Sequence, residues 1–222
     1  MTAFAPILEA ALARTGGDDA LAARLPEAQS ADALRAVTDD RYLSLMSLRV
    51  FRAGIKHSVV DARWPAFEEA FHGFDPGRVR AMSDEDLELL MGDTRLIRHW
   101  GKIKSVRANA AAMAVVSEES GGFGAYLAAW PGETVVALWD DLAKRFSNLG
   151  GASGPYFLRM AGKDTFILTP SVVKALNHWG AVDGDPKGKR ARAQVQEIFN
   201  AWALETGRPL CQLSMILAVS VD

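Results

Sequence analysis

The feature that most constrains the fold is the helical spacing of the hydrophobic residues along nearly the whole chain. From Leu96 to Val116, apolar residues recur every three or four positions, which predicts one long amphipathic helix. The same spacing predicts further helices over 4–15, 31–60, 66–71, 84–90, 124–130, 133–146, 170–179, 190–206 and 210–221. Asp39-Asp40 is a candidate break in the run over 31–60, and Pro65 is well placed to open the helix over 66–71. Ser83, before an acidic first turn, is a candidate cap of the helix over 84–90. Only Phe166–Leu168 has the pattern of a short strand. The sequence therefore predicts an all-α fold.

Composition and charge exclude several classes of protein. The chain has 222 residues, of which 49% are hydrophobic and 23% charged, as in an ordinary globular protein rather than a disordered one. Its formal net charge of -2 gives no sign of nucleic-acid binding, so any basic surface must be local. Cys211 is the single cysteine, which excludes an internal disulfide framework and a multi-thiolate metal site.

The first residues and the hydropathy profile bear on location. The segment from Met1 to Pro6 has neither the basic nor the apolar stretch of a secretory signal, so we expect none. No run approaches the roughly 18 apolar residues that a membrane span needs. We expect a cytoplasmic protein with no membrane partner, folded as a single unit over 1–222.

A glycine-rich segment between two predicted helices is the most informative local feature. It reads NLGGASGPY from Asn148 to Tyr156, and Pro155 suits the first turn of the following helix. Glycines at 150, 151 and 154 permit positive φ angles and close approach to the backbone. The N–H groups at the start of the next helix can then bind an anion such as a DNA phosphate. The alternative is a tight turn that binds nothing.

The stretch from Phe71 to Arg107 carries a family resemblance. It contains FHGFDP at 71–76 and LIRHWGKI at 96–103, and FRAG at 51–54 precedes it. These residues closely resemble the DNA-3-methyladenine glycosylase I family of the helix–hairpin–helix glycosylase superfamily. The resemblance covers roughly residues 45–115, and the hairpin at 149–156 falls where the superfamily places its DNA-binding hairpin.

The resemblance implies a fold, a partner and an activity. We expect two helical lobes with a cleft between them: a central lobe over about 45–170, and a second lobe from about 1–44 plus 171–222. The expected partner is double-stranded DNA containing a damaged base, so the protein would be nucleoid-associated when it acts, with no obligate protein partner. The implied activity is monofunctional hydrolysis of the N-glycosidic bond of an alkylated, 3-methyladenine-like base in base excision repair, after the damaged nucleotide is flipped out.

Two positions depart from the family at the base pocket. The family's pocket glutamate, which binds the cationic base, corresponds to Arg49, and its pocket tryptophan corresponds to His57. A cation facing a cationic base is repelled, so we expect an altered base preference. The alternative is that Arg49 turns away and pairs with Asp39 or Asp40.

Other candidate residues follow from the same comparison. Tyr42, two helical turns before Arg49, and Tyr156, just after the hairpin, are candidate aromatics of the base pocket. Tyr156 stands near the place of the superfamily's nucleophilic lysine, so lyase chemistry is not expected. The superfamily's catalytic aspartate corresponds to Thr169 or Pro170. Asp164 is the nearest acid and is a weak catalytic candidate, with a loop residue or helix cap as the alternative.

The chain lacks the family's zinc ligands. No cysteine or histidine precedes His57, and only His178 and Cys211 remain near the C-terminus. Two such residues do not make a four-ligand site, so we expect no zinc and no other cofactor.

Phosphate contacts are expected first at the hairpin, at Gly150, Gly151, Ser153 and Gly154. The densest basic run, which contains Lys187, Lys189 and Arg190, is a second candidate, with a solvated helix start as the alternative. Three further basic residues are candidates for phosphate contacts, with a solvated helical face as the alternative: Arg98, Lys102 and Lys104.

Three functions remain open from the sequence. The first is a glycosylase of alkylated DNA. The second is a catalytically impaired DNA-binding paralogue that keeps the hairpin and the pocket, which Arg49 and His57 favour. The third is a helical protein-interaction domain without a role on DNA, which would show no salt-dependent affinity for DNA.

Overall fold

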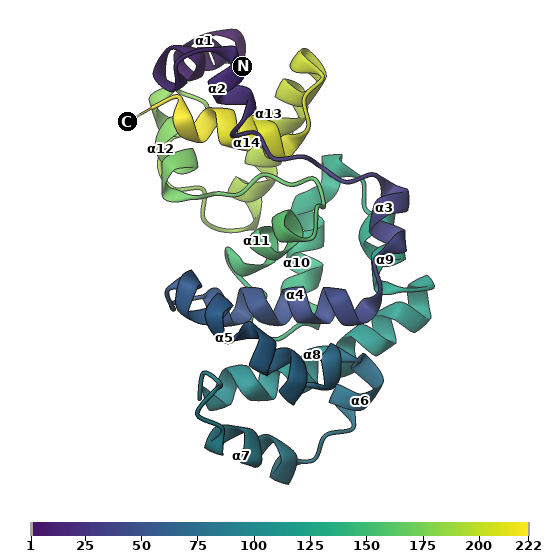
Figure 1. Cartoon of the computed structure of the whole chain (residues 1–222). Helices are drawn as coiled ribbons and strands as arrows, with labels where there is room; N and C mark the ends of the chain where they lie inside the picture. The colour runs from purple at the N-terminus through teal and green to yellow at the C-terminus, as the bar shows by residue number, and fades with distance from the viewer. Residues whose placement is uncertain (1, 222) are drawn as a thin grey trace. The chain divides into compact units, whose positions relative to one another are not determined.

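A computed structural model describes residues 2–221, and its regular structure there is entirely helical. The elements, shown in Figure 1, are α1 (Ala5–Thr15), α2 (Asp18–Ala22), α3 (Ala31–Ala36), α4 (Asp39–Arg52), α5 (His57–Ala70), η1 (His72–Phe74), α6 (Pro76–Arg80), α7 (Asp84–Gly92), α8 (Trp100–Ser120), α9 (Phe123–Ala129), η2 (Gly132–Thr134), α10 (Val135–Arg145), α11 (Ser153–Met160), α12 (Pro170–His178), α13 (Lys189–Thr206) and α14 (Leu210–Val219). The expected all-α class is confirmed.

The chain forms two compact units, and each is built from segments that are separate in the sequence. The first unit comprises residues 1–29, 131–138 and 162–222, and the second comprises 30–130 and 139–161. The expected division into a central lobe over about 45–170 and a second lobe over about 1–44 plus 171–222 stays a prediction.

The first unit is organised around α14, which packs against α1, α12 and α13. Burial explains why residues 166–168 do not form the expected strand. Phe166 is fully buried and stacks on Phe199 of α13 with ring centroids 4.2 Å apart, while the segment itself has no regular structure. A side chain buried against a helix thus replaces strand pairing.

The second unit is organised around α4 and α8, which pack against each other. The helical run expected over 31–60, with Asp39-Asp40 as a candidate break, is divided into α3, α4 and the start of α5. Asp39 explains the first break, because its carboxylate accepts hydrogen bonds from the Ser117 hydroxyl at 2.5 Å and the Phe123 N–H at 2.9 Å. These contacts fix the start of α4 against α8 and α9.

The helix expected over 66–71, with Pro65 at its start, begins earlier, at His57, so Pro65 lies inside α5. A proline there removes one backbone hydrogen bond and normally kinks a helix. Its side chain is exposed, so water can reach the carbonyl left without a partner. The flanking aromatic residues hold the helix, because Trp64 stacks on Phe67 with an interplanar angle of 15°.

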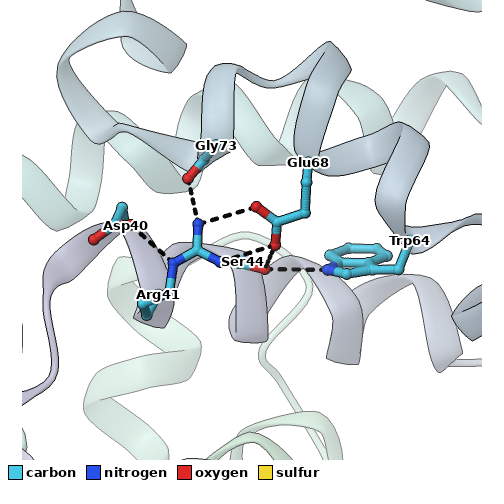
Figure 2. Close-up of polar contacts among 6 residues, drawn as sticks. All are labelled: Asp40, Arg41, Ser44, Trp64, Glu68 and Gly73. Carbon is cyan, nitrogen blue, oxygen red and sulfur yellow. Dashed lines mark hydrogen bonds and ion pairs between the residues drawn. The ribbon is translucent and has the colours of Figure 1, made fainter.

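A polar network joins α4, α5 and η1 within this unit, and Figure 2 shows it. Arg41 donates to both carboxylate oxygens of Glu68, at 3.1 and 3.0 Å, and to the Gly73 carbonyl at 2.6 Å. Glu68 also accepts from the Ser44 hydroxyl, which itself accepts from the Trp64 indole N–H. The paired guanidinium and carboxylate therefore anchor the first turn of α4.

Candidate functional site

The glycine-rich hairpin connects α10 to α11, as the sequence indicated. Gly151 has a φ of 60° and Asn148 a φ of 63°, so two residues of the hairpin adopt the left-handed conformation. Gly150 and Gly151 are exposed, and a Cβ atom built at either would meet nothing within 4 Å. These two glycines leave the backbone open to a ligand.

Gly154 has a different role from the two exposed glycines. It is buried at the start of α11, where a Cβ atom would lie 2.9 Å from the Leu149 carbonyl oxygen. Glycine is therefore required for close packing at this position. No side chain of the described residues caps the first turn of α11, which begins at Ser153. The Ser153 N–H already donates to the Gly150 carbonyl at 3.2 Å, and Pro155 has no N–H.

A buried asparagine fixes the base of the hairpin. Asn109 of α8 is 1% exposed; its Oδ1 accepts from the Ser147 N–H at 2.7 Å and its Nδ2 donates to the Ser147 carbonyl at 3.1 Å. This pair of bonds holds the hairpin on α8 without using the groups at its tip. Reading the sequence did not identify Asn109 as a site residue, although its position on the apolar face of a long helix was a usable signal.

A surface hollow of about 530 Å³ lies beside the hairpin. Its lining comes from α8 and the hairpin: Gly101, Lys104, Ser105, Arg107, Ala108, Ser147 and Asn148. The Arg107 guanidinium already has partners within the protein, since it donates to the Met82 carbonyl and to the Asp84 carboxylate. Lys104 is exposed and lies 5.3 Å above the Trp100 ring, which leaves its ammonium group accessible to an anion.

Arg49 and Tyr156 lie together, although 107 positions separate them in the sequence. The Arg49 guanidinium carbon is 4.7 Å from the centre of the Tyr156 ring, within the range of a cation–π contact. Burial lowers the pKa of Arg49, and the charge of Arg52 acts in the same direction. The structure thus brings together two of the four expected pocket residues.

The other two expected pocket residues lie elsewhere. Tyr42 is 1% exposed, donates to the Leu34 carbonyl at 2.8 Å and packs edge-on against Phe123, so it serves as a core residue. His57 is exposed at the first turn of α5 and makes no hydrogen bond or ring contact with any residue that the structure describes.

The alternative, in which Arg49 pairs with Asp39 or Asp40, is wrong. Asp39 is engaged by Ser117 and Phe123, and Asp40 pairs with Arg41 at 2.8 Å (Figure 2). The Arg49 Nε atom is buried without a hydrogen-bond partner within residues 2–221.

Lys102 is neither a phosphate contact nor part of a solvated face. Its ammonium donates to the carbonyls of Phe51 and Ala53, at 3.2 and 2.5 Å, and so caps the end of α4. Burial lowers the pKa of Lys102, and the charge of Arg49 adds to this effect.

The remaining candidates belong to the first unit. Asp164 accepts from the N–H groups of Leu210 and Cys211, at 3.0 and 2.8 Å, so its carboxylate caps α14. Lys187 pairs with Asp185 at 2.9 Å, while Lys189 and Arg190 are exposed at the start of α13. These contacts give Asp164 a structural role and leave Lys189 and Arg190 exposed to solvent.

Within residues 2–221 the structure has neither a metal-ligand cluster nor a membrane-spanning helix. In the part of the chain that the structure describes, no three histidine, cysteine, aspartate or glutamate side chains gather as a metal site. No helix within residues 2–221 is long and apolar enough to cross a bilayer.

Comparison with known proteins agrees with the helical fold. A relative, DNA-3-methyladenine glycosylase 1 of Escherichia coli (strain K12), is 38% identical over 76 residues, which are 34% of this chain and 41% of that protein. The chain thus matches less than half the length of this relative. A crystal structure of 3-methyladenine DNA glycosylase I is similar with a TM-score of 0.50 and 25% identity, covering 62% of this chain and 81% of that one.

A wider likeness extends over almost the whole chain. The structure of Methanocaldococcus jannaschii 8-oxoguanine glycosylase/lyase with DNA is similar with a TM-score of 0.57 over 95% of this chain and 94% of that one. Its identity of 13% limits this likeness to the fold. Residues 34–147, more than half of the chain, match the methyladenine glycosylase family. The chain belongs to the methyladenine glycosylase family, with the fold of the helix–hairpin–helix DNA glycosylases.

Proposed function

We propose that this protein is a DNA N-glycosylase that releases an alkylated base from double-stranded DNA. The observation that carries the proposal is the hairpin, whose exposed glycines and uncapped helix start lie on a fixed base beside Lys104. Backbone N–H groups of this kind bind phosphates irrespective of sequence, which suits an enzyme that must examine any stretch of DNA. Membership of the family supplies the expectation of base release.

The proposed reaction has few chemical requirements when the base is alkylated on a ring nitrogen. Such a base already carries a positive charge, so it leaves without being protonated. The protein must hold the DNA, accept the flipped nucleotide and admit water to C1′ of the sugar. This is compatible with Asp164 acting as a helix cap rather than as a catalytic acid.

A second candidate function is a DNA-binding protein that no longer hydrolyses the glycosidic bond. The unpaired guanidinium of Arg49 supports it, because a cationic base would be repelled there. The two functions share the hairpin and differ only in whether a base is released.

The test is base release from methylated duplex DNA, followed by alkaline cleavage of the abasic sites. The glycosylase proposal predicts new abasic sites and salt-dependent DNA affinity, with a log–log slope of about −0.9 for each phosphate neutralised. Gly151→Asp should weaken both, because it adds a negative charge at the hairpin. A protein that binds DNA in this way but releases neither alkylated nor neutral bases would support the second function instead.

Gly207→Asp is the matched control. Gly207 is also exposed, has a φ of 67° and would accept a Cβ atom without contact within 4 Å, but it ends α13. The same substitution there should leave DNA affinity unchanged. Equal effects of the two substitutions would contradict a specific role for the hairpin.

A further inference from the structure

Arg49 is a half-buried cation whose electrostatic requirements the protein does not meet. Its Nε atom is closed off from solvent without an acceptor, and within the described residues the side chain makes no ion pair. Buried donors in native proteins nearly always have partners, so one without them calls for an explanation. An arginine offers only donors, so the missing partner must be an acceptor.

The neighbours of Arg49 reinforce this requirement. Lys102 is held by two carbonyl groups at the end of α4, and Arg52 pairs with Asp61 at 2.7 Å. Both are cations: in addition to burial, the charge of Arg52 lowers the pKa of Arg49, and the charge of Arg49 lowers the pKa of Lys102. Tyr156 supplies a ring face 4.7 Å from the guanidinium carbon and makes no hydrogen bond to Nε. The described surroundings are therefore electropositive and offer no acceptor to Nε.

We infer that Arg49 recognises the base, and that the preferred base is a neutral purine with two acceptors on one edge, such as N7 and O6 of hypoxanthine. This rests on the glycosidic hydrolysis of the proposed function and replaces the cationic alkylated base as the preferred substrate. The guanidinium is a planar fork of donors that binds two acceptors at once, and arginine pairs with purine N7 and O6 in this way. A purine methylated on a ring nitrogen carries a positive charge that Arg49 would repel. Arg49 is thus a specificity-determining residue.

The same contact assists the release of a neutral base. When the bond between C1′ and N9 breaks, its electron pair stays on the purine, and negative charge spreads to N7 and O6. Donors placed at these atoms stabilise that charge as it develops. Water supplies the hydroxyl group that bonds to C1′, and its proton ends on the released base.

A flipped base fits this site better than a backbone phosphate. Phosphates stay at the protein surface, and their contacts here are already available at the hairpin and Lys104. A flipped base is taken out of water and held against aromatic side chains. The half-buried position of Arg49 against Tyr156 matches the second situation.

The inference is tested by titrating the full-length protein with methylated free bases in a calorimeter. The probes are 9-methylhypoxanthine, its 7-deaza analogue, which lacks the N7 acceptor, and the 3,9-dimethyladeninium cation. We expect 9-methylhypoxanthine to bind about tenfold or more tightly than either of the others, as a bidentate pair with a base provides. Arg49→Gln should abolish the difference, and Arg49→Lys should retain only part of it.

Arg52→Gln is the control, because it removes a nearby arginine that already has a partner. It should leave the order of binding unchanged. Binding of 3,9-dimethyladeninium at least as tight as that of 9-methylhypoxanthine would overturn the inference, and so would an unchanged order in Arg49→Gln. Absence of binding by all three probes would also overturn it.

This experiment separates the inference from the proposed function, because free bases bind without DNA and without hydrolysis. The expected order of binding in a protein that releases no base from any duplex would contradict the glycosylase proposal alone. Release of cationic bases from DNA, together with preferential binding of the cation, would contradict the inference alone.

Discussion

The hairpin and the end of α4 belong to the same unit but meet their physical requirements in different ways. At the base of the hairpin, Asn109 satisfies both backbone groups of Ser147, and Gly154 allows contact with Leu149. At the end of α4, Arg49 has a ring beside it and no acceptor. The comparison indicates that the hairpin satisfies its own hydrogen bonds and keeps its tip open to a ligand. The Arg49 site, in contrast, lacks an acceptor that a ligand would have to supply.

The largest expected effect comes from filling the buried glycine of the hairpin. Gly154→Val places a side chain against the Leu149 carbonyl, and overpacking of this kind lowers the free energy of unfolding by about 1–3 kcal/mol. Gly150→Ala is the matched change, since nothing lies within 4 Å of its Cβ position, and it should change stability by less than about 0.5 kcal/mol. Urea denaturation followed by circular dichroism measures both. Similar losses in the two variants would show that the hairpin does not divide into a packed and an open part.

A paired and an unpaired arginine on α4 provide the next contrast. Arg41→Met removes the partner of Glu68 and should lower the free energy of unfolding by about 1–2 kcal/mol. Arg49→Met removes a desolvated charge that has no partner, so it should change stability by less than about 1 kcal/mol or raise it. The measurement is again the urea midpoint. A larger loss for Arg49→Met than for Arg41→Met would mean that the protein itself stabilises Arg49.

The third effect depends on pH and tests whether Tyr42 belongs to the core rather than to an open pocket. Burial raises the pKa of Tyr42 to about 12, and the charge of Asp39 adds to the shift. Between pH 10 and 12 the unfolded chain therefore binds fewer protons at this residue than the folded protein, so stability falls as the pH rises. Tyr42→Phe should be less stable at neutral pH, because the hydrogen bond to the Leu34 carbonyl is lost, and its stability should fall less steeply in this range.

The comparison between wild type and Tyr42→Phe cancels the contribution of Tyr126, another buried tyrosine whose pKa is raised by burial and by Asp141. Equal alkaline slopes for the two proteins would place the Tyr42 hydroxyl in contact with water.

The smallest expected effect is that of metal removal, which should be zero. Within residues 2–221 no cluster of metal ligands is present, and the sequence lacks the zinc ligands of the family. Exhaustive chelation should leave the melting temperature unchanged. Zinc at one ion per chain in elemental analysis of the purified protein would contradict this expectation.

Sequence patterns predicted the features that depend on local interactions. The all-α class follows from periodicity, and Ser83 caps α7 by accepting from the Asp86 N–H, as the acidic first turn after it indicated. The hairpin was also visible, because glycines and a proline mark it directly. The path of residues 166–168 was not, because the burial of Phe166 against Phe199 depends on tertiary packing.

The candidate site was only partly predictable for the same reason. The family comparison pointed to Arg49 and Tyr156 separately, but their contact joins α4 to α11 across much of the chain. The partners of Asp39 and Asp40 come from α8, α9 and the neighbouring Arg41, so the sequence left open whether either acid was free to bind Arg49. Tyr42 had the right spacing for the pocket, yet α9 covers its ring.

One titration can test whether the hairpin binds phosphates while Arg49 recognises the base. Affinity for two duplexes, one unmodified and one with a single hypoxanthine, is measured over a range of salt concentrations for wild type and Arg49→Gln. The account predicts that wild type prefers the hypoxanthine duplex and that Arg49→Gln loses this preference while keeping the salt slope, because the phosphate contacts lie elsewhere. A slope reduced by about 0.9 with the preference intact would contradict it, since Arg49 would then be a phosphate contact.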